Sequence, residues 1–208
     1  TEIYTLSLHD ALPISRDIDR GNHPHYLIKE IGESPDSVRA TLRGRLVDGS
    51  AVRLGPETFG GGLQADLAAG RIARVVVVGQ GTAAVAGRAV AAAVEAELAT
   101  TGISVEAHPA TELSGFGLLP DMSDTLVVAI SQSGTTTDTN RTVDLVRARG
   151  ARVVAIVNRR NSDLIDRADG VLYTSDGRDV EMSVASTKAF YCQRSEERRV
   201  GKECRSRW

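Results

Sequence analysis

The chain has 208 residues, 41% of them hydrophobic and 25% charged, which is typical of a soluble globular protein. A net charge of −2 gives no general attraction to nucleic acid or to a membrane surface, and no apolar run reaches the roughly 20 residues that span a bilayer. Two cysteines, Cys192 and Cys204, are too few for a disulfide framework and lack zinc-binding spacing. With no recognisable secretion signal, we expect a cytoplasmic protein that uses no metal or cofactor and contacts neither nucleic acid nor membrane.

The two ends differ in character from the middle of the chain. Residues 1–15 lead into no periodic pattern, and residues 194–208 mix six Lys/Arg with three Asp/Glu, a lone Cys and the only Trp. A net charge of +3 is weak for a nucleic-acid-binding arm. We interpret both ends as translated adapter sequence and exclude them from the fold, so that the core is expected to be a fragment of a longer protein.

Residues 16–70 are predicted to form an N-terminal helical segment and a connector. Ser34 followed by Pro35 is typical of a helix N-cap and first helical position, which predicts a second helix there. Apolar residues then recur every fourth position at Val38, Leu42 and Leu46. The glycine-rich stretch 47–70 is expected to be a connector with a short helix at 63–69.

Strands and helices alternate in the remainder of the chain. Five short runs predict strands, at 75–78, 103–109, 125–131, 152–158 and 170–175. Helices are predicted at 82–100, 139–149 and 162–169, with Gly150 ending the second and Ser162 capping the third, and another begins at 186. This order predicts an α/β fold, a parallel sheet covered by helices on both faces. Ligands bind such sheets outside the carboxyl ends of the strands.

The first strand is followed by Gly79-Gln80-Gly81-Thr82-Ala83-Ala84. This run satisfies a G-x-G-x-x-A dinucleotide fingerprint, and Glu106, at the end of the next strand, would supply the ribose-binding acid. The alternative is a tight strand-to-helix turn in which the alanines allow close packing.

The third strand is followed by Ser131-Gln132-Ser133-Gly134-Thr135-Thr136. A helix N-terminus offers free N–H groups and a partial positive charge, and the glycine lets the backbone approach a ligand closely. Capping of the helix accounts for one or two of the hydroxyls. The excess favours a phosphate-binding loop.

A third polar segment, Glu181–Phe190, follows the last strand and contains Ser183, Ser186 and Thr187. Lys188 is either a counter-charge for a phosphate or a solvated lysine in the first turn of a helix. The histidines on either side of Pro24 are interpreted as part of a surface turn rather than as metal ligands.

Three segments together resemble one family. They are "HYLIKEIGESPDSVRATLRGR", "AISQSGTTTDT" and "EMSVASTKAF", and the similarity extends from His25 to Gln193. The family is the glucosamine-6-phosphate synthases, the isomerising glutamine–fructose-6-phosphate aminotransferases, and the matching part is their first sugar isomerase (SIS) domain. The resemblance implies a flavodoxin-like, three-layer α/β/α SIS domain at 71–193 with a five-stranded parallel sheet.

The resemblance also implies which residues bind the ligand, fructose 6-phosphate or glucosamine 6-phosphate. Ser131, Gln132, Ser133 and Thr136 would hold the phosphate. Thr82, Val184 and Ser186 match positions near the sugar, and Lys188 belongs to the same V-A-S-T-K segment. The family's C-G-T-S turn reads Gln80-Gly81-Thr82-Ala83, with one hydroxyl fewer, and the usual Glu of S-Q-S-G-E-T is Thr135.

The same resemblance implies that the proton-transfer groups belong to a second SIS domain and that ammonia comes from a glutaminase domain. Neither is present in this chain, so we expect no catalytic residue here, an inactive fragment, and a homodimer only in the full-length protein. The alternatives are a ketose-aldose phosphate isomerase, a sugar-phosphate-sensing regulator and, less favoured, a dinucleotide-binding domain.

Overall fold

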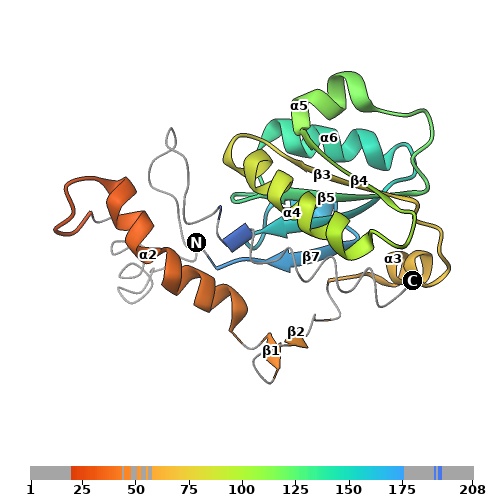
Figure 1. Cartoon of the computed structure of the whole chain (residues 1–208). Coiled ribbons are helices and arrows are strands. Elements are labelled where there is room, and N and C mark those ends of the chain that lie inside the picture. Colours follow the sequence, from red (N-terminus) through yellow and green to blue (C-terminus); the bar gives the residue numbers. More distant parts are fainter. Residues whose placement is uncertain are drawn as a thin grey trace, which may run out of the picture.

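A five-stranded parallel sheet forms the centre of the molecule (Figure 1), seen in a computed structural model that describes residues 20–43, 45–47, 51–52, 55, 58–175, 190 and 192–193. The strand order is β4-β3-β5-β6-β7, and all neighbours run parallel. The strands are β3 (Arg74–Gly79), β4 (Ser104–Pro109), β5 (Thr125–Ser131), β6 (Arg152–Val157) and β7 (Gly170–Tyr173). All five strand predictions are confirmed. The inner strands β3, β5 and β6 are Val- and Ile-rich runs buried on both faces, as expected for a parallel sheet. The edge strand β4 is only partly buried.

Helices cover both faces of this sheet, each over its own hydrophobic core. On one face lie α3 (Gly61–Ala68) and α4 (Thr82–Leu98), whose apolar side chains pack with those of all five strands. The other face is covered by α5 (Ala110–Glu112), the π-helix η1 (Leu113–Gly117), α6 (Thr137–Arg147) and α7 (Asp163–Asp166). The predicted three-layer architecture is confirmed. The short helices α5 and η1 were not predicted.

The N-terminal helix α2 (Tyr26–Leu42) lies beside the α/β body in Figure 1 and corrects one prediction. It is a single helix that runs through Ser34 and Pro35, so neither residue starts a new helix. The Ser34 hydroxyl instead donates to the carbonyl oxygen of Glu30 at 2.9 Å, as serines within helices do. The helix accommodates Pro35, although an internal proline removes one backbone hydrogen bond.

The predicted apolar stripe also ends earlier than expected, because α2 stops at Leu42. Arg43 takes an extended conformation (φ −60°, ψ 130°), and Leu46 lies in the two-residue strand β1 (Leu46–Val47). This strand pairs antiparallel with β2 (Ala51–Val52). Further along the chain, α3 confirms the short helix predicted in the connector.

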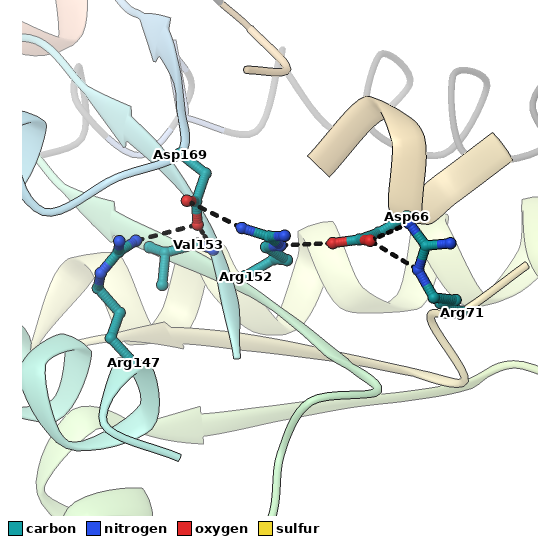
Figure 2. A network of polar contacts seen from close by, with 6 residues as sticks. All are labelled: Asp66, Arg71, Arg147, Arg152, Val153 and Asp169. Carbon is teal, nitrogen blue, oxygen red and sulfur yellow. Dashed lines mark hydrogen bonds and ion pairs between the residues drawn. The ribbon is translucent and has the colours of Figure 1, made fainter. Parts of the chain in front are cut away.

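A polar network joins the amino end of β6 to the helices on either side of it (Figure 2). Asp66 of α3 accepts hydrogen bonds from the guanidinium groups of Arg71 and Arg152. Asp169 accepts from Arg147 at 3.0 Å and from the Val153 N–H at 2.7 Å, and its other oxygen lies 3.7 Å from Arg152. The charges of Arg71, Arg147 and Arg152 are thus paired with carboxylates.

Among the described residues, no helix is both long enough and apolar enough to cross a membrane.

Candidate functional site

The candidate site lies at the carboxyl ends of β3 and β5, at the edge opposite the polar network. The two strands are neighbours, with Val78 opposite Ala129. The turns that follow Gly79 and Ser131 therefore leave the sheet side by side, where parallel α/β sheets bind their ligands.

The loop from Ser131 to Thr136 folds around the hydroxyl of Ser131, a residue only 3% exposed. Its Oγ accepts a hydrogen bond from the Gly134 N–H at 3.0 Å and lies 3.3 Å from Oγ1 of Thr136. Oγ of Ser133 accepts from both the N–H and the hydroxyl of Thr135, at 3.2 and 3.1 Å. The structure thus brings Ser131 and Thr136 together, while Ser133 takes part in a local turn.

Helix α6 begins directly after this loop, and none of the loop hydroxyls caps it. Thr136 occupies the N-cap position, but its side chain makes no hydrogen bond to the first-turn N–H groups. The expectation that one or two hydroxyls serve as caps was therefore wrong, because the Thr136 hydroxyl is within reach of Ser131 instead. An uncapped N-terminus keeps its donors and partial positive charge available to an anion, although Asp138 also lies in this first turn.

Gly134 determines the shape of the loop. Its φ of +67° lies in the left-handed region, and a Cβ there would overlap Ser162 and lie 3.0 Å from Cγ2 of Val157. Its carbonyl oxygen accepts hydrogen bonds from the Asn140 side chain at 3.2 Å and from the Leu164 N–H at 3.1 Å. Both α6 and α7 therefore hold this residue in place.

The segment after β6 also holds the loop, and the sequence analysis did not predict this. The Gln132 carbonyl oxygen accepts from the N–H groups of Asn158 and Arg159, each at 3.2 Å. Ser162 precedes α7 as predicted, but its side chain makes no capping bond. Its buried Oγ lies against Gly134 and has no hydrogen-bond partner among the residues that the structure describes. The available signal was the polar run "NRRNS" at the end of a strand.

The turn after β3 positions Thr82 as the first residue of α4. Gly81 is the N-cap residue with φ +60°, a conformation that favours glycine. A Cβ on Gly79 would lie 3.0 Å from Cβ of Ala83, so Ala83 packs closely against the strand. Thr82 is half-buried and leaves the sheet beside the Ser131 loop.

Glu106 does not lie where a dinucleotide site would need it. It was expected at the end of its strand, but β4 continues to Pro109 and pairs Glu106 with Val76. Its carboxylate contacts Nε2 of His108 at 3.0 Å and Nη2 of Arg74 at 3.9 Å. The acid of the proposed fingerprint is therefore in the middle of an edge strand.

The other predicted positions add no described contact to the site. Val184, Ser186 and Lys188, like the adapter-like ends, lie outside the described residues. His23 and His25 are exposed. Within the described part of the chain, no group of three or more His, Cys, Asp or Glu is arranged to hold a metal ion.

Most of this chain is similar in sequence to known enzymes. The chain is 41% identical over 175 residues to the glutamine–fructose-6-phosphate aminotransferase (isomerising) of Symbiobacterium thermophilum, and the match covers 84% of this chain and 27% of the relative. The enzyme of the same name from Tropheryma whipplei (strain Twist) is 35% identical over 192 residues, which cover 92% of this chain and 28% of the relative. The chain thus spans little more than a quarter of the length of either enzyme.

Solved structures share the fold of this chain. The C-terminal domain of glucosamine-fructose-6-phosphate aminotransferase from Francisella tularensis superposes with a TM-score of 0.69 at 23% identity. The superposition covers 91% of this chain and 51% of that one, and at this identity it shows the fold alone. Residues 71–195 match the SIS domain model, so the chain belongs to the SIS domain family.

Proposed function

We propose that this chain is the sugar-phosphate-binding SIS domain of an isomerising glutamine–fructose-6-phosphate aminotransferase. The observation that carries the proposal is the Ser131–Thr136 loop at the uncapped start of α6. A phosphate ester needs several short donors, and this loop combines hydroxyls, an amide side chain and helix N–H groups. The relatives' names supply the substrate, fructose 6-phosphate.

Each residue of the proposed site has a defined role. Ser131, Gln132, Ser133 and Thr136 bind the phosphate, and Thr82 lies near the sugar from the neighbouring turn. Val184 and Ser186, from the segment that follows β7 in the sequence, contact the sugar, and Lys188 supplies a counter-charge for the phosphate. These residues bind and orient the ligand, which lowers the barrier to a reaction by positioning, and none of them transfers a proton.

In the whole enzyme, ammonia released from glutamine forms an imine at C2 of fructose 6-phosphate. A proton then moves from C1 to C2, which yields glucosamine 6-phosphate. We assign the ammonia source and the proton-transfer groups to domains outside this chain. The chain alone is therefore expected to be inactive, and in the whole enzyme we propose a cytoplasmic homodimer.

The test is binding of fructose 6-phosphate to the 208-residue chain by isothermal titration calorimetry, with fructose, inorganic phosphate and NAD as comparison ligands. The proposal expects fructose 6-phosphate to bind more tightly than either fructose or phosphate. Binding of NAD alone would contradict it. Turnover of fructose 6-phosphate with ammonia by this chain would contradict the assignment of catalysis to other domains and would favour a different SIS enzyme.

A further inference from the structure

Two consecutive arginines, Arg159 and Arg160, follow β6 at the same edge as the Ser131–Thr136 loop. The backbone N–H of Arg159 donates to the Gln132 carbonyl oxygen at 3.2 Å. A few residues on, the N–H of Leu164 donates to the Gly134 carbonyl oxygen at 3.1 Å. Because these hydrogen bonds join the segment to the loop at Arg159 and again at Leu164, the backbone of the arginine pair is held close to the proposed phosphate site.

The charges of this pair are not neutralised by carboxylates of the described residues. Both side chains are exposed, and no described Asp or Glu lies within ion-pair distance of either guanidinium. At the opposite edge, Arg71, Arg147 and Arg152 are paired with Asp66 or Asp169 (Figure 2), whereas Arg149 donates to the Leu145 carbonyl oxygen and pairs with no described carboxylate. The fold therefore leaves positive charge available at the edge where a phosphate would arrive.

An aromatic ring holds one of the two cations in place. The guanidinium carbon of Arg160 lies 4.4 Å from the ring centroid of Tyr173, the last residue of β7. Val157 and Tyr173 are paired across the sheet, so this ring is at the carboxyl edge. A cation–π contact restrains an arginine side chain without cancelling its charge, which a carboxylate partner would do.

Two carboxylates at the same edge oppose the arginines. Asp138 lies in the first turn of α6, and Asp163 is the first residue of α7. Asp138 and Asp163 would repel an incoming phosphate dianion, and the arginine pair offsets this repulsion.

We propose that Arg159 and Arg160 form a cationic rim that attracts hexose 6-phosphates to the Ser131–Thr136 loop and strengthens their binding. The inference rests on the proposed function, because it needs a phosphate-bearing ligand at this loop. Exposed charges act across solvent, so their effect depends on ionic strength. The rim favours sugar phosphates over neutral sugars, whereas the hydroxyls of the loop position the bound phosphate.

The test measures fructose 6-phosphate affinity of the 208-residue chain at about 20 mM and about 500 mM salt, conditions of weak and strong screening. The variants are Arg159→Gln and Arg160→Gln. Arg88→Gln, on an exposed position of α4, changes the net charge equally and is the matched control. Each rim variant is expected to bind about two- to fivefold more weakly at low salt, as for exposed ion pairs, and to approach the parent at high salt.

Variants of Tyr173 test whether restraint of the Arg160 side chain by the aromatic ring contributes to binding in addition to the arginine's charge. Tyr173→Phe keeps the ring and is expected to bind like the parent, whereas Tyr173→Leu should fall between the parent and Arg160→Gln. Arg159 makes no contact with the ring that the structure records, so Arg159→Gln still tests the rim if a Tyr173 variant unfolds.

The outcomes distinguish the two proposals. If the parent binds fructose 6-phosphate and both rim variants bind equally well at low salt, the rim is rejected while the proposed function stands. If the rim variants and Arg88→Gln weaken binding equally, net charge alone is responsible, and the rim is again rejected. If the parent fails to bind at either salt concentration, both proposals are overturned.

Discussion

Gly134 and Ser162 pack so closely that a Cβ atom on the glycine would lie 2.6 Å from Cβ of the serine. One residue belongs to the loop before α6 and the other precedes α7, so the two loops at the carboxyl edge form a single packed unit. A side chain at Gly134 would also have to adopt φ +67°.

The first prediction therefore concerns Gly134→Ala. We expect the free energy of unfolding to fall by at least about 1–3 kcal/mol, the cost of backbone strain of this kind, and the overlap with Ser162 adds to this loss. Urea unfolding measures it. Gly32→Ala, inside α2, is the matched control and should be neutral or stabilising, because an added Cβ there would meet no described atom within 4 Å beyond the backbone of its own helix. Equal behaviour of the two variants would show that the loop does not require a glycine.

A second prediction concerns the central hydroxyl of the loop. Ser131→Ala leaves the N–H of buried Gly134 without its acceptor, which costs about 1–3 kcal/mol of stability. It also removes a phosphate contact, so fructose 6-phosphate affinity should fall by about tenfold, as for the loss of one hydrogen bond to a charged group. Ser104→Ala, exposed at the opposite edge, should change neither quantity. Unchanged affinity in Ser131→Ala would contradict the phosphate role.

The polar network of Figure 2 predicts a pH dependence of stability. Hydrogen bonds from Arg71, and then from Arg152, lower the pKa of Asp66. A lowered pKa stabilises the folded state at every pH above the unfolded-state pKa of about 3.9, and this contribution is lost as the pH falls through the folded-state value. Asp66→Asn should therefore lower Tm at pH 7, and the difference from the parent should shrink below about pH 4.

The control for Asp66 is Asp36→Asn, which removes an exposed ion pair with Arg39. Exposed pairs of this kind contribute about 0–1 kcal/mol, so its Tm should follow the parent at every pH. A Tm difference for Asp66→Asn that did not change with pH would show that the amide acts by altered packing rather than by loss of charge.

The fourth prediction concerns the contact between α2 and the end of β7. Thr41, 2% exposed, accepts a hydrogen bond from the Ser175 N–H at 2.9 Å. Thr41→Val keeps the shape but removes the acceptor, so amide hydrogen exchange should accelerate in α2 and at Ser175 while β5 and β6 stay protected. Thr111→Val, at an exposed position of α5, is the control. Exchange that accelerated evenly over the whole chain would instead indicate global destabilisation.

The sequence predicted the sheet well because burial on both faces demands apolar, β-branched strands wherever they pair. This requirement is visible in the local sequence, in runs such as Val75–Val78 and Thr125–Ser131. It also predicted the loop before α6, since hydroxyls and a glycine are required there by local geometry. Thr82 and the Ser131 loop are brought together because β3 and β5 are neighbours in the sheet, a strand order that was not predicted from the sequence.

The predictions that were wrong rested on local sequence patterns, at positions where other parts of the chain determine the structure. Ser34 and Pro35 are typical of a helix start, yet the preceding residues continue the helix through them. Ser162 occupies the N-cap position of α7 as predicted, but its side chain packs against Gly134, 28 positions away in the sequence, and makes no capping hydrogen bond. The hydrogen bonds from the Asn158 and Arg159 N–H groups to the Gln132 carbonyl oxygen likewise join residues that are far apart in the sequence.

The core beneath α4 limits how far the chain can be shortened from its N-terminal side. Phe59, Leu63 and Leu67 are each at most 6% exposed and pack into the same core as the sheet, although they precede the SIS match at residues 71–195. Asp66, from the same segment, pairs with Arg152 of β6. The smallest autonomous folding unit therefore includes α3, and a polypeptide trimmed to begin at Arg71 would expose an apolar surface that invites aggregation.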